Sequence, residues 1–317
     1  MCIIIRKGHA MISKVFIDGS AGTTGLRIYE RLSQRSDIEL ITLTEERRKD
    51  REARAEALNR SDIAFLCLPD AAAVEAVSFV TNKNTAIIDT STAHRTADGW
   101  EYGFAELSHR RERIAQSKRI ANPGCHASGF IALVEPLVRG GLLSKSAQLS
   151  CFSLTGYSGG GKKMIEQYED AQRDMYLDSP AMYANGQSHK HLPEMSKICG
   201  LENLPVFCPI VAPFYSGMQV TIPIFKDQVN GTVDDIKALY RAYYQNGLVR
   251  YVDHYASVSL CANAYSGRDD MQITVSGNDD RILLVSRFDN LGKGASGSAI
   301  QNMNIIMGVP EDTGLDV

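Results

Sequence analysis

The sequence predicts an α/β fold, with a doubly wound parallel sheet in the first half of the chain and an α+β unit with a mixed or antiparallel sheet in the second. Three observations predict it. Short apolar strands alternate with helical stretches as far as residue 122, a pattern typical of right-handed βαβ units. The first strand enters a helix through a glycine-rich turn. Beyond residue 150 the strands follow one another with fewer helices between them.

The length of the chain indicates two domains. It has 317 residues, and a single hydrophobic core rarely grows beyond about 250–300 residues. We expect a first domain over residues 12–124, completed by a C-terminal helix at about 295–317, and a second domain over residues 125–294.

The composition excludes several classes of partner. A net charge of −3, with 44% hydrophobic and 22% charged residues, is typical of an ordinary globular protein and gives no reason to expect nucleic acid or an acidic membrane. No apolar run reaches the roughly 18 residues that span a bilayer. The seven cysteines form no Cys-x-x-Cys pair, which favours a reducing cytoplasm over disulfides or a zinc site. The first ten residues do not resemble a signal peptide, and Met11 could be an alternative start.

The first element, "KVFIDGSAGTTGLRIYERL", reads as a β-branched strand, a turn and an amphipathic helix. Its glycines, Gly19, Gly22 and Gly25, have the spacing G-x-x-G-x-x-G. Such a turn lets the backbone approach a pyrophosphate while the following helix directs its N–H groups at the anion. A glycine-rich turn alone could be a plain loop, but the strand before it and the helix after it favour a Rossmann-type nucleotide site.

The next elements complete the first sheet. We expect strands at 38–44, 62–69, 85–91 and 118–122, with helices at 51–60 and 71–80 between some of them.

The segment after the second strand, "TEERRKD", bears on the choice of nucleotide. An acidic residue at this place favours NAD, whereas basic residues accommodate a 2′-phosphate. Glu45 and Glu46 keep NAD possible, but Arg47, Arg48 and Lys49 favour NADP. The alternative is that these charges form only the solvated start of a helix.

One cysteine stands in a special place. In "NPGCHASGFIALVEPLV", Pro123 and Gly124 break a strand, and Cys125 begins an apolar helix that Pro136 is expected to end or kink. The N–H groups and dipole at a helix start favour the thiolate, so Cys125 is a candidate nucleophile. The alternative is inert packing, which we expect of five other cysteines from their apolar neighbours: Cys67, Cys151, Cys199, Cys208 and Cys261.

A second polar motif, "IIDTSTAHR", follows a strand at the carboxyl edge of the first sheet, where ligands bind in this architecture. Ser91 and Thr92 belong to it, and Arg95 could hold a phosphate or carboxylate by a bidentate contact.

The second half begins with a strand, a glycine-rich loop and a helix in "CFSLTGYSGGGKKMIEQY". Further strands are expected in "MQVTIPIF", "VSLCANAY", "MQITVSGN" and "RILLVSRFDN". The stretch "NLGKGASGSAIQNMNIIMG" predicts a final apolar helix that packs back on the nucleotide domain.

Two histidines, His189 and His191, stand in "SHKHLPEM". In an extended segment both would lie on one face, as two metal ligands do, but no third ligand pattern lies nearby. A base for the thiol or a carboxylate-binding histidine fits better, and an ordinary surface loop is the alternative.

Together these stretches resemble a known family. A nucleotide domain that leads into "NPGC" is similar to the superfamily of aspartate-semialdehyde and glyceraldehyde-phosphate dehydrogenases. Within it, "GSAGTTG", "RRKD", "DTSTAHR", "YGFAEL", "TGYSGGGK", "HKHLPEM" and "DNLGKGASGSAIQN" resemble the shorter, bacterial N-acetyl-γ-glutamyl-phosphate reductases, in the expected order from residue 19 to 302. One departure is Ala105, where the family pattern has proline.

The resemblance implies a reaction and a set of residues. The family reduces N-acetyl-glutamyl 5-phosphate with NADPH to the 5-semialdehyde and phosphate, in arginine biosynthesis, through a cysteine thioester. It implies that Cys125 is the nucleophile, that His189 or His191 transfers the proton, and that a dimer or tetramer forms. Implied substrate-binding residues are Ser91, Arg95 and Glu194. Implied NADP(H)-binding residues are Gly19, Gly22, Thr23, Thr24, Gly25, Arg47, Arg48, Ser158, Gly159, Gly160, Lys162 and Asn302. No metal is implied.

Two alternatives remain. An aspartate-semialdehyde dehydrogenase would use the same cysteine, but the histidine expected before a later strand is missing from "FYSGMQVTIPI". A nucleotide-binding regulator without catalysis would not need Cys125, Arg95 and the histidine pair together.

Overall fold

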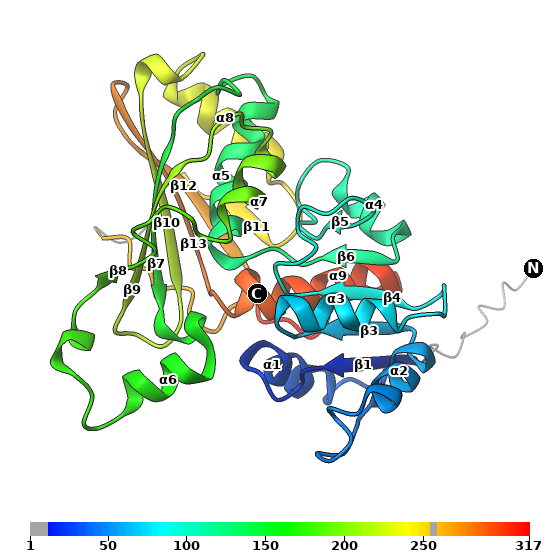
Figure 1. Ribbon diagram of the computed structural model, residues 1–317. Helices are drawn as coiled ribbons and strands as arrows, with labels where there is room; N and C mark the ends of the chain where they lie inside the picture. Colours follow the sequence, from blue (N-terminus) through cyan, green and yellow to red (C-terminus); the bar gives the residue numbers. More distant parts are fainter. Residues whose placement is uncertain (1–11, 254–258) are drawn as a thin grey trace, which may run out of the picture.

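The structure is a computed structural model that describes residues 12–253 and 259–317. The possible start at Met11 and the residues before it, including Cys2 and His9, lie outside the described residues, as does His254. Two sheets make up the molecule, and α5 (Cys125–Arg139) leads from the first to the second (Figure 1).

The first sheet has six strands in the order β2-β1-β3-β4-β6-β5, and every neighbouring pair is parallel. The strand order reverses at β1, so the predicted doubly wound α/β architecture is confirmed. The short edge strand β5 was not predicted. The strands are β1 (Ser13–Asp18), β2 (Ile38–Ile41), β3 (Ile63–Leu66), β4 (Ala86–Asp89), β5 (Glu101–Tyr102) and β6 (Arg119–Ala121).

Helices cover both faces of this sheet because successive side chains of a buried strand point to opposite faces. Val15 and Ile17 of β1 pack in the core that α1 and α9 share, whereas Phe16 packs on the side of α2 and α3. The C-terminal helix α9 thus returns to the first sheet, as expected from its apolar sequence (Figure 1). The helices are α1 (Thr23–Leu32), α2 (Arg51–Arg60), α3 (Asp70–Ser78), α4 (Arg110–Gln116) and α9 (Gly297–Met307).

The second sheet has seven strands in the order β11-β12-β13-β10-β7-β9-β8 and is mixed, as predicted. The expected strand at 258–265 is wrong for its described part, because residues 262–267 form successive turns with bonds such as Ala264 N–H to the Cys261 carbonyl. The strands are β7 (Ser150–Gly156), β8 (Ala181–Met182), β9 (Val206–Ala212), β10 (Met218–Phe225), β11 (Val249–Tyr251), β12 (Met271–Gly277) and β13 (Arg281–Phe288).

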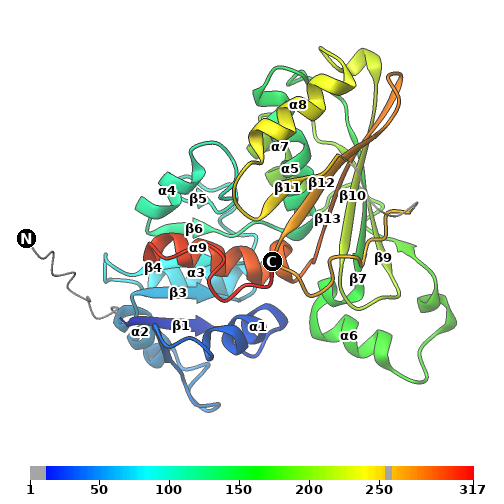
Figure 2. The ribbon, with the colours of Figure 1, turned by 180° about the vertical axis from the view of Figure 1, so that it is seen from behind.

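Only one face of the second sheet is covered by helices in the described part of the chain. α5, α7 (Leu192–Cys199) and α8 (Val233–Tyr243) pack on that face and enclose the largest core (Figure 2). The opposite face exposes apolar side chains, among them Phe152 and Leu283.

Helix α5 runs through Pro136 to Arg139, so the helix does not end at the proline, which was one of the two expected outcomes. Proline lacks the N–H that would bond the carbonyl of Ala132. The hydroxyl of Tyr244 donates to that carbonyl at 2.7 Å and replaces the missing bond. Packing from a distant segment therefore keeps the helix continuous.

The remaining elements border the space between the sheets. α6 (Gly161–Glu169) follows the glycine-rich loop after β7, and a π-helical turn, Gly292–Ser296, precedes α9. None of the helices in residues 12–253 and 259–317 is long and apolar enough to cross a membrane.

Candidate active site

Cys125 is the first residue of α5 and follows the turn that ends β6. Its side chain is half-buried in a cleft between the two sheets. Burial raises the pKa of the Cys125 thiol, and this outweighs the opposing effects of Arg95 and of a hydrogen bond from the His126 backbone. The helix start predicts a lowered pKa for Cys125. That prediction is wrong, because the desolvation of the thiolate has the larger effect.

The turn before Cys125 requires glycine. A side chain at Gly124 would clash with Arg95, His191 and Glu194, all of which converge on this backbone. Sequence motifs up to 99 residues apart are thus brought together beside the thiol.

Arg95 joins three segments. Its Nε donates to the carbonyl of Asn122 at 3.0 Å, and its Nη2 donates to the carbonyl of Thr90 at 3.2 Å. Its Nη1 donates to Oε1 of Glu194 at 2.8 Å. The guanidinium lines the cleft with Cys125, but each of its three nitrogens already has a partner within the described structure.

Glu194 lies behind the cleft rather than in its wall. Its Oε2 accepts hydrogen bonds from the Tyr102 hydroxyl at 2.9 Å and the Gly124 N–H at 3.2 Å, while Oε1 takes Arg95. With both oxygens engaged and the residue 1% exposed, Glu194 has the geometry of a residue that positions Arg95 and the Cys125 turn. We therefore replace the direct substrate contact expected from the sequence with a positioning role.

The two histidines of the "HKH" segment both line the cleft. Burial, with smaller effects from nearby cations, lowers the pKa of His189 and lowers that of His191 far more, so both rings are neutral near pH 7. Nδ1 of His189 accepts a hydrogen bond from the His191 N–H at 3.2 Å, which leaves its Nε2 as a donor. Nδ1 of His191 is buried without a partner among the described residues.

The glycine-rich loop after β7 forms another part of the cleft wall. Ser158, Gly159 and Gly160 all line the cleft. The loop is fixed by Asn290, whose Nδ2 donates to the Ser158 hydroxyl at 3.0 Å and whose Oδ1 accepts the Gly217 N–H at 2.9 Å. This cleft has a volume of about 320 Å³, which suits a small acyl substrate beside a ring of the cofactor.

A larger cleft of about 730 Å³ opens at the carboxyl end of β1, where the strand order reverses. Its glycines are sterically required: a side chain at Gly19 (φ +88°) would clash with the Cys67 carbonyl, and one at Gly25 would clash with the Gly19 carbonyl. No side chain caps the first turn of α1 at Gly22, so its N–H groups are free to meet an anion.

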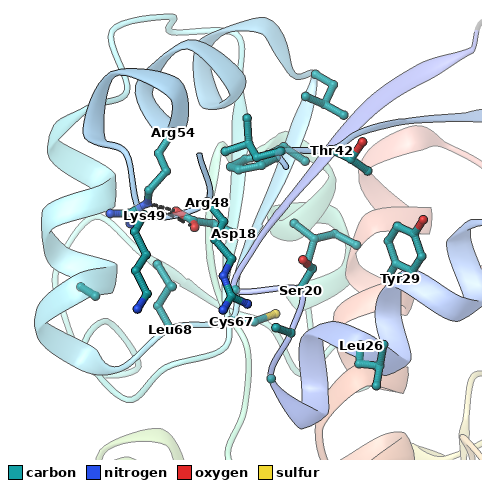
Figure 3. Close-up of a pocket in the computed structure, with 18 of the residues that line it drawn as sticks. Asp18, Ser20, Leu26, Tyr29, Thr42, Arg48, Lys49, Arg54, Cys67 and Leu68 are labelled. Carbon is teal, nitrogen blue, oxygen red and sulfur yellow. Dashed lines mark hydrogen bonds and ion pairs between the residues drawn. The ribbon is translucent and has the colours of Figure 1, made fainter. Parts of the chain in front are cut away.

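Basic side chains lie at the far end of this cleft. Figure 3 shows Arg48 and Lys49 in its wall, next to the buried pair of Asp18 and Arg54, joined by Nη2 and Oδ2 at 2.9 Å. Arg48 also pairs with Glu45. Arg47, which the sequence grouped with Arg48, is exposed and is not part of the wall.

A third hollow, of about 290 Å³, connects the two sites. Thr23, Ser91 and Arg95 line it, together with Lys190. The Ser91 hydroxyl donates to Oδ2 of Asp89 at 2.7 Å, which stabilises the loop after β4. Thr23 and Thr24 also line the Cys125 cleft, so the start of α1 faces both sites.

Two expected cofactor residues lie elsewhere. Lys162 is exposed and outside all three hollows. Asn302 is fully buried in α9, where its Nδ2 donates to the Gly103 carbonyl at 2.9 Å and to Oδ1 of Asn122 at 3.2 Å. Helix α9, which carries Asn302, packs against the first sheet. The hydrogen bond from Asn302 to Asn122 therefore supports the turn before Cys125.

Among the residues of the cleft wall that sequence reasoning missed are Tyr183, Lys190 and Asn290. Lys190 lies within the quoted "HKH" motif, so the motif itself contained the signal. Tyr183 follows a two-residue strand without a recognisable pattern.

The other cysteines differ in burial. Cys151 and Cys199 are buried as predicted, and Cys67 and Cys208 are half-buried. Burial raises the pKa of Cys67 to about 12, which makes its thiol inert. Cys261 is exposed, so its expected packing is wrong; it begins the series of turns that replaces the expected strand.

No group of three or more potential metal ligands occurs within residues 12–253 and 259–317.

Comparisons with known proteins agree with this geometry. The family model described as "Semialdehyde dehydrogenase, NAD binding domain" matches residues 14–117, and "Semialdehyde dehydrogenase, dimerisation domain" matches residues 125–290. Among solved structures, aspartate semialdehyde dehydrogenase II from Vibrio cholerae, complexed with ASA, has a TM-score of 0.72 at 14% identity over 93% of this chain and 98% of that chain. The enzyme from Candida albicans with NADP has a TM-score of 0.62 at 15% identity over 93% and 98%. These structures share the fold.

Curated relatives are much more similar in sequence. N-acetyl-gamma-glutamyl-phosphate reductase 2 from Nostoc sp. is 44% identical over 95% of this chain and 99% of its own length. The N-acetyl-gamma-glutamyl-phosphate reductase of Brucella ovis is 44% identical over 94% of this chain and 100% of its own length. With the Cys125 cleft joined to a nucleotide cleft, this chain belongs to the N-acetyl-gamma-glutamyl-phosphate reductase family of the semialdehyde dehydrogenases.

Proposed function

We propose that this chain reduces N-acetyl-L-glutamyl 5-phosphate to N-acetyl-L-glutamate 5-semialdehyde with NADPH and releases phosphate, a step of arginine biosynthesis. The observation that carries the proposal is the position of Cys125, in a cleft that also contains Arg95 and the histidine pair and adjoins the glycine-lined cleft. The family relationship supports the same reaction.

The residues of the nucleotide cleft fit NADP(H). The close backbone approach at Gly19 and Gly25 leaves room for a pyrophosphate at the start of α1. Arg48 and Lys49 supply positive charge for a 2′-phosphate at the far end. When bound, NADPH supplies the hydride that reduces the carbonyl carbon.

The chain's own residues perform the covalent steps. His191 takes the thiol proton, because its ring lines the cleft with Cys125 and burial keeps that ring neutral and able to accept one. The Cys125 sulfur then attacks the acyl carbon, the bond to phosphate breaks, and a thioester forms. After hydride addition the tetrahedral adduct collapses to the aldehyde, and the cysteine regains its proton from His191. A base is needed because burial raises the pKa of Cys125.

Arg95 and Lys190 are the cations that face the leaving phosphate. Arg95 is paired with Glu194, and Asp70 lines the connecting hollow near both cations. Lys190 lines both the cleft and the hollow and adds the second positive charge at the phosphate.

A panel of semialdehydes, assayed in reverse with phosphate and NADP, tests the reaction. Highest kcat/KM is expected for N-acetyl-glutamate 5-semialdehyde. Preference for aspartate semialdehyde would favour the aspartate-semialdehyde dehydrogenase reaction, and absence of turnover with NADP binding intact would favour a regulator.

We also infer a homo-oligomer that forms through the uncovered face of the second sheet. Phe152 and Leu283 are 45% and 39% exposed on it, and Gln219 and Thr274 each have a buried side-chain oxygen without a partner in the described chain. Leu283→Lys should lower the mass measured by light scattering.

The division into domains at 12–124 with 295–317 and at 125–294 remains a proposal that the packing of α9 supports.

A further inference from the structure

Tyr183 lies in the wall of the Cys125 cleft and is held there by its neighbours. It follows β8, and its N–H donates to the carbonyl of Pro209 at 3.0 Å. Gln187 forms two hydrogen bonds with the backbone of Phe207, each of 2.8 Å. Ala184 and Gln187 both have left-handed backbone, with φ of +53° and +52°. Non-glycine residues adopt this conformation rarely, so tertiary contacts impose the path that presents Tyr183.

A chain of hydrogen bonds leads from the sheet interior to Tyr183. Its hydroxyl lies 2.7 Å from Nε2 of His126, and Nδ1 of the same ring lies 2.7 Å from the Ser153 hydroxyl. Burial lowers the pKa of His126 to about 3, so the ring is neutral near pH 7 and has one N–H. The ring must therefore donate at one end and accept at the other.

Ser153 sets the direction of this chain. Its side chain is fully buried in β7, and His126 is its only hydrogen-bond partner in the described part of the molecule. A buried hydroxyl hydrogen without an acceptor is strongly disfavoured, so Ser153 donates to Nδ1. The His126 proton then lies on Nε2 and is donated to the Tyr183 oxygen. Consequently the hydrogen of Tyr183 itself is free to point into the cleft.

Tyr183 and Cys125 also interact electrostatically. Burial raises the pKa of Tyr183, and the negative charge of the Cys125 thiolate raises it further. The phenol thus keeps its proton near pH 7, and it lines the same cleft as Cys125.

We propose that Tyr183 is a further catalytic residue, which donates a hydrogen bond to the negative charge at Cys125, first on the thiolate and then on the oxygen of its tetrahedral adduct. His126 and Ser153 are positioning residues that direct this donor. The proposal rests on the cysteine chemistry described under the proposed function and adds a donor that the sequence motifs did not contain.

The first test is Tyr183→Phe, which keeps the ring and removes the donor. Loss of one donor to a developing oxyanion should lower kcat by about 10² to 10³, with the Kd for NADPH unchanged. Tyr176→Phe is the matched control, since Tyr176 is 79% exposed and lies outside the cleft. Unchanged kcat in Tyr183→Phe would overturn the proposal.

A second measurement does not depend on the substrate. In a Cys261→Ser background, the pH midpoint for alkylation of Cys125 should rise by about one pH unit or more in Tyr183→Phe, because the thiolate loses a donor. An unchanged midpoint would overturn the thiolate contact. A wild-type protein that does not turn over the acyl phosphate would contradict the proposed function, while the alkylation midpoint would still decide the role of Tyr183.

The third test separates the relay from simple packing. Ser153→Ala removes the hydrogen bond that fixes the His126 tautomer and allows Tyr183 to turn its hydrogen to His126, so kcat should fall with little change in KM. In the Tyr183→Phe background the same substitution should have almost no further effect on kcat, because the donor is already absent. If the fold-losses in kcat of the two single variants instead multiply in the double variant, Ser153 acts on structure alone and the relay is overturned.

Discussion

The guanidinium of Arg95 donates from Nη1 to Oε1 of Glu194 at 2.8 Å, beneath the turn that presents Cys125, with side-chain exposures of 9% and 1%. The pair joins the loop after β4 to α7, and so fixes the two parts of the site to each other. Removing the charge of one partner of such a buried ion pair leaves the charge of the other partner uncompensated. Glu194→Gln should therefore lower kcat and the melting temperature together, whereas a residue that only contacted substrate would change kcat or KM alone.

Cys125→Ser should abolish turnover and leave NADPH binding intact. A serine hydroxyl is far less acidic than a thiol and is a weaker nucleophile with the same histidine base, and the glycine cleft is untouched. When wild-type protein is mixed with acyl phosphate without NADPH, mass spectrometry should find the acyl adduct on Cys125. An adduct on another cysteine would contradict the mechanism. Because Cys261 is exposed, alkylation experiments need the Cys261→Ser background.

Arg95→Lys should raise the KM for phosphate in the reverse assay more than the KM for NADP, because lysine keeps the charge but loses the planar fork. Lys190→Met should raise the phosphate KM as well, since Lys190 lines both the cleft and the connecting hollow. Equal changes for phosphate and NADP in both variants would contradict an anion site here.

Arg48→Ala should weaken NADP binding by about ten- to a hundredfold and leave NAD binding nearly unchanged, since the lost contact is to the 2′-phosphate. Arg47→Ala is the matched comparison and should have little effect, because Arg47 lies outside the cleft wall. Titration calorimetry with both cofactors measures this. Equal losses for NADP and NAD would show that Arg48 supports the fold instead.

His191→Asn should lower kcat by about 10² to 10⁴, and His189→Asn by less. His191 has the nitrogen that is buried without a partner in the described structure, whereas Nδ1 of His189 is already occupied. Steady-state assays at several pH values distinguish the two. Near-normal kcat in both variants would place the base elsewhere.

Acid should destabilise the protein through His126. Its pKa is about 3 in the folded state and about 6.5 when unfolded, so between these values the unfolded chain binds more protons. The contribution to stability is complete above pH 6.5 and falls by about 1.4 kcal/mol per pH unit toward pH 3. His126→Gln, which cannot titrate, should reduce the slope of unfolding free energy between pH 6.5 and 5 by about one proton. An unchanged slope would contradict a neutral, buried His126.

Local patterns determined most of the fold. The βαβ alternation, the glycine spacing and the "NPGC" turn depend on backbone geometry over a few residues, and each was recognisable in the sequence. The first sheet, the start of α1 and the position of Cys125 at the start of α5 followed from them. Where a local rule was overridden, as at Pro136, the cause was a hydroxyl more than a hundred residues away.

The sequence by itself thus determined the two-sheet α/β fold, the nucleotide cleft and the place of the candidate nucleophile Cys125. Only the tertiary structure decided how the site around that nucleophile works. It turned Glu194 and Asn302 inward as supports, placed Lys190 and Tyr183 in the wall, and raised the pKa of Cys125 where the helix start alone predicts a fall. Burial and long-range contacts set these properties. They arise from residues far apart in the chain, and the spacing of residues along the sequence does not say which distant side chains will surround a given group.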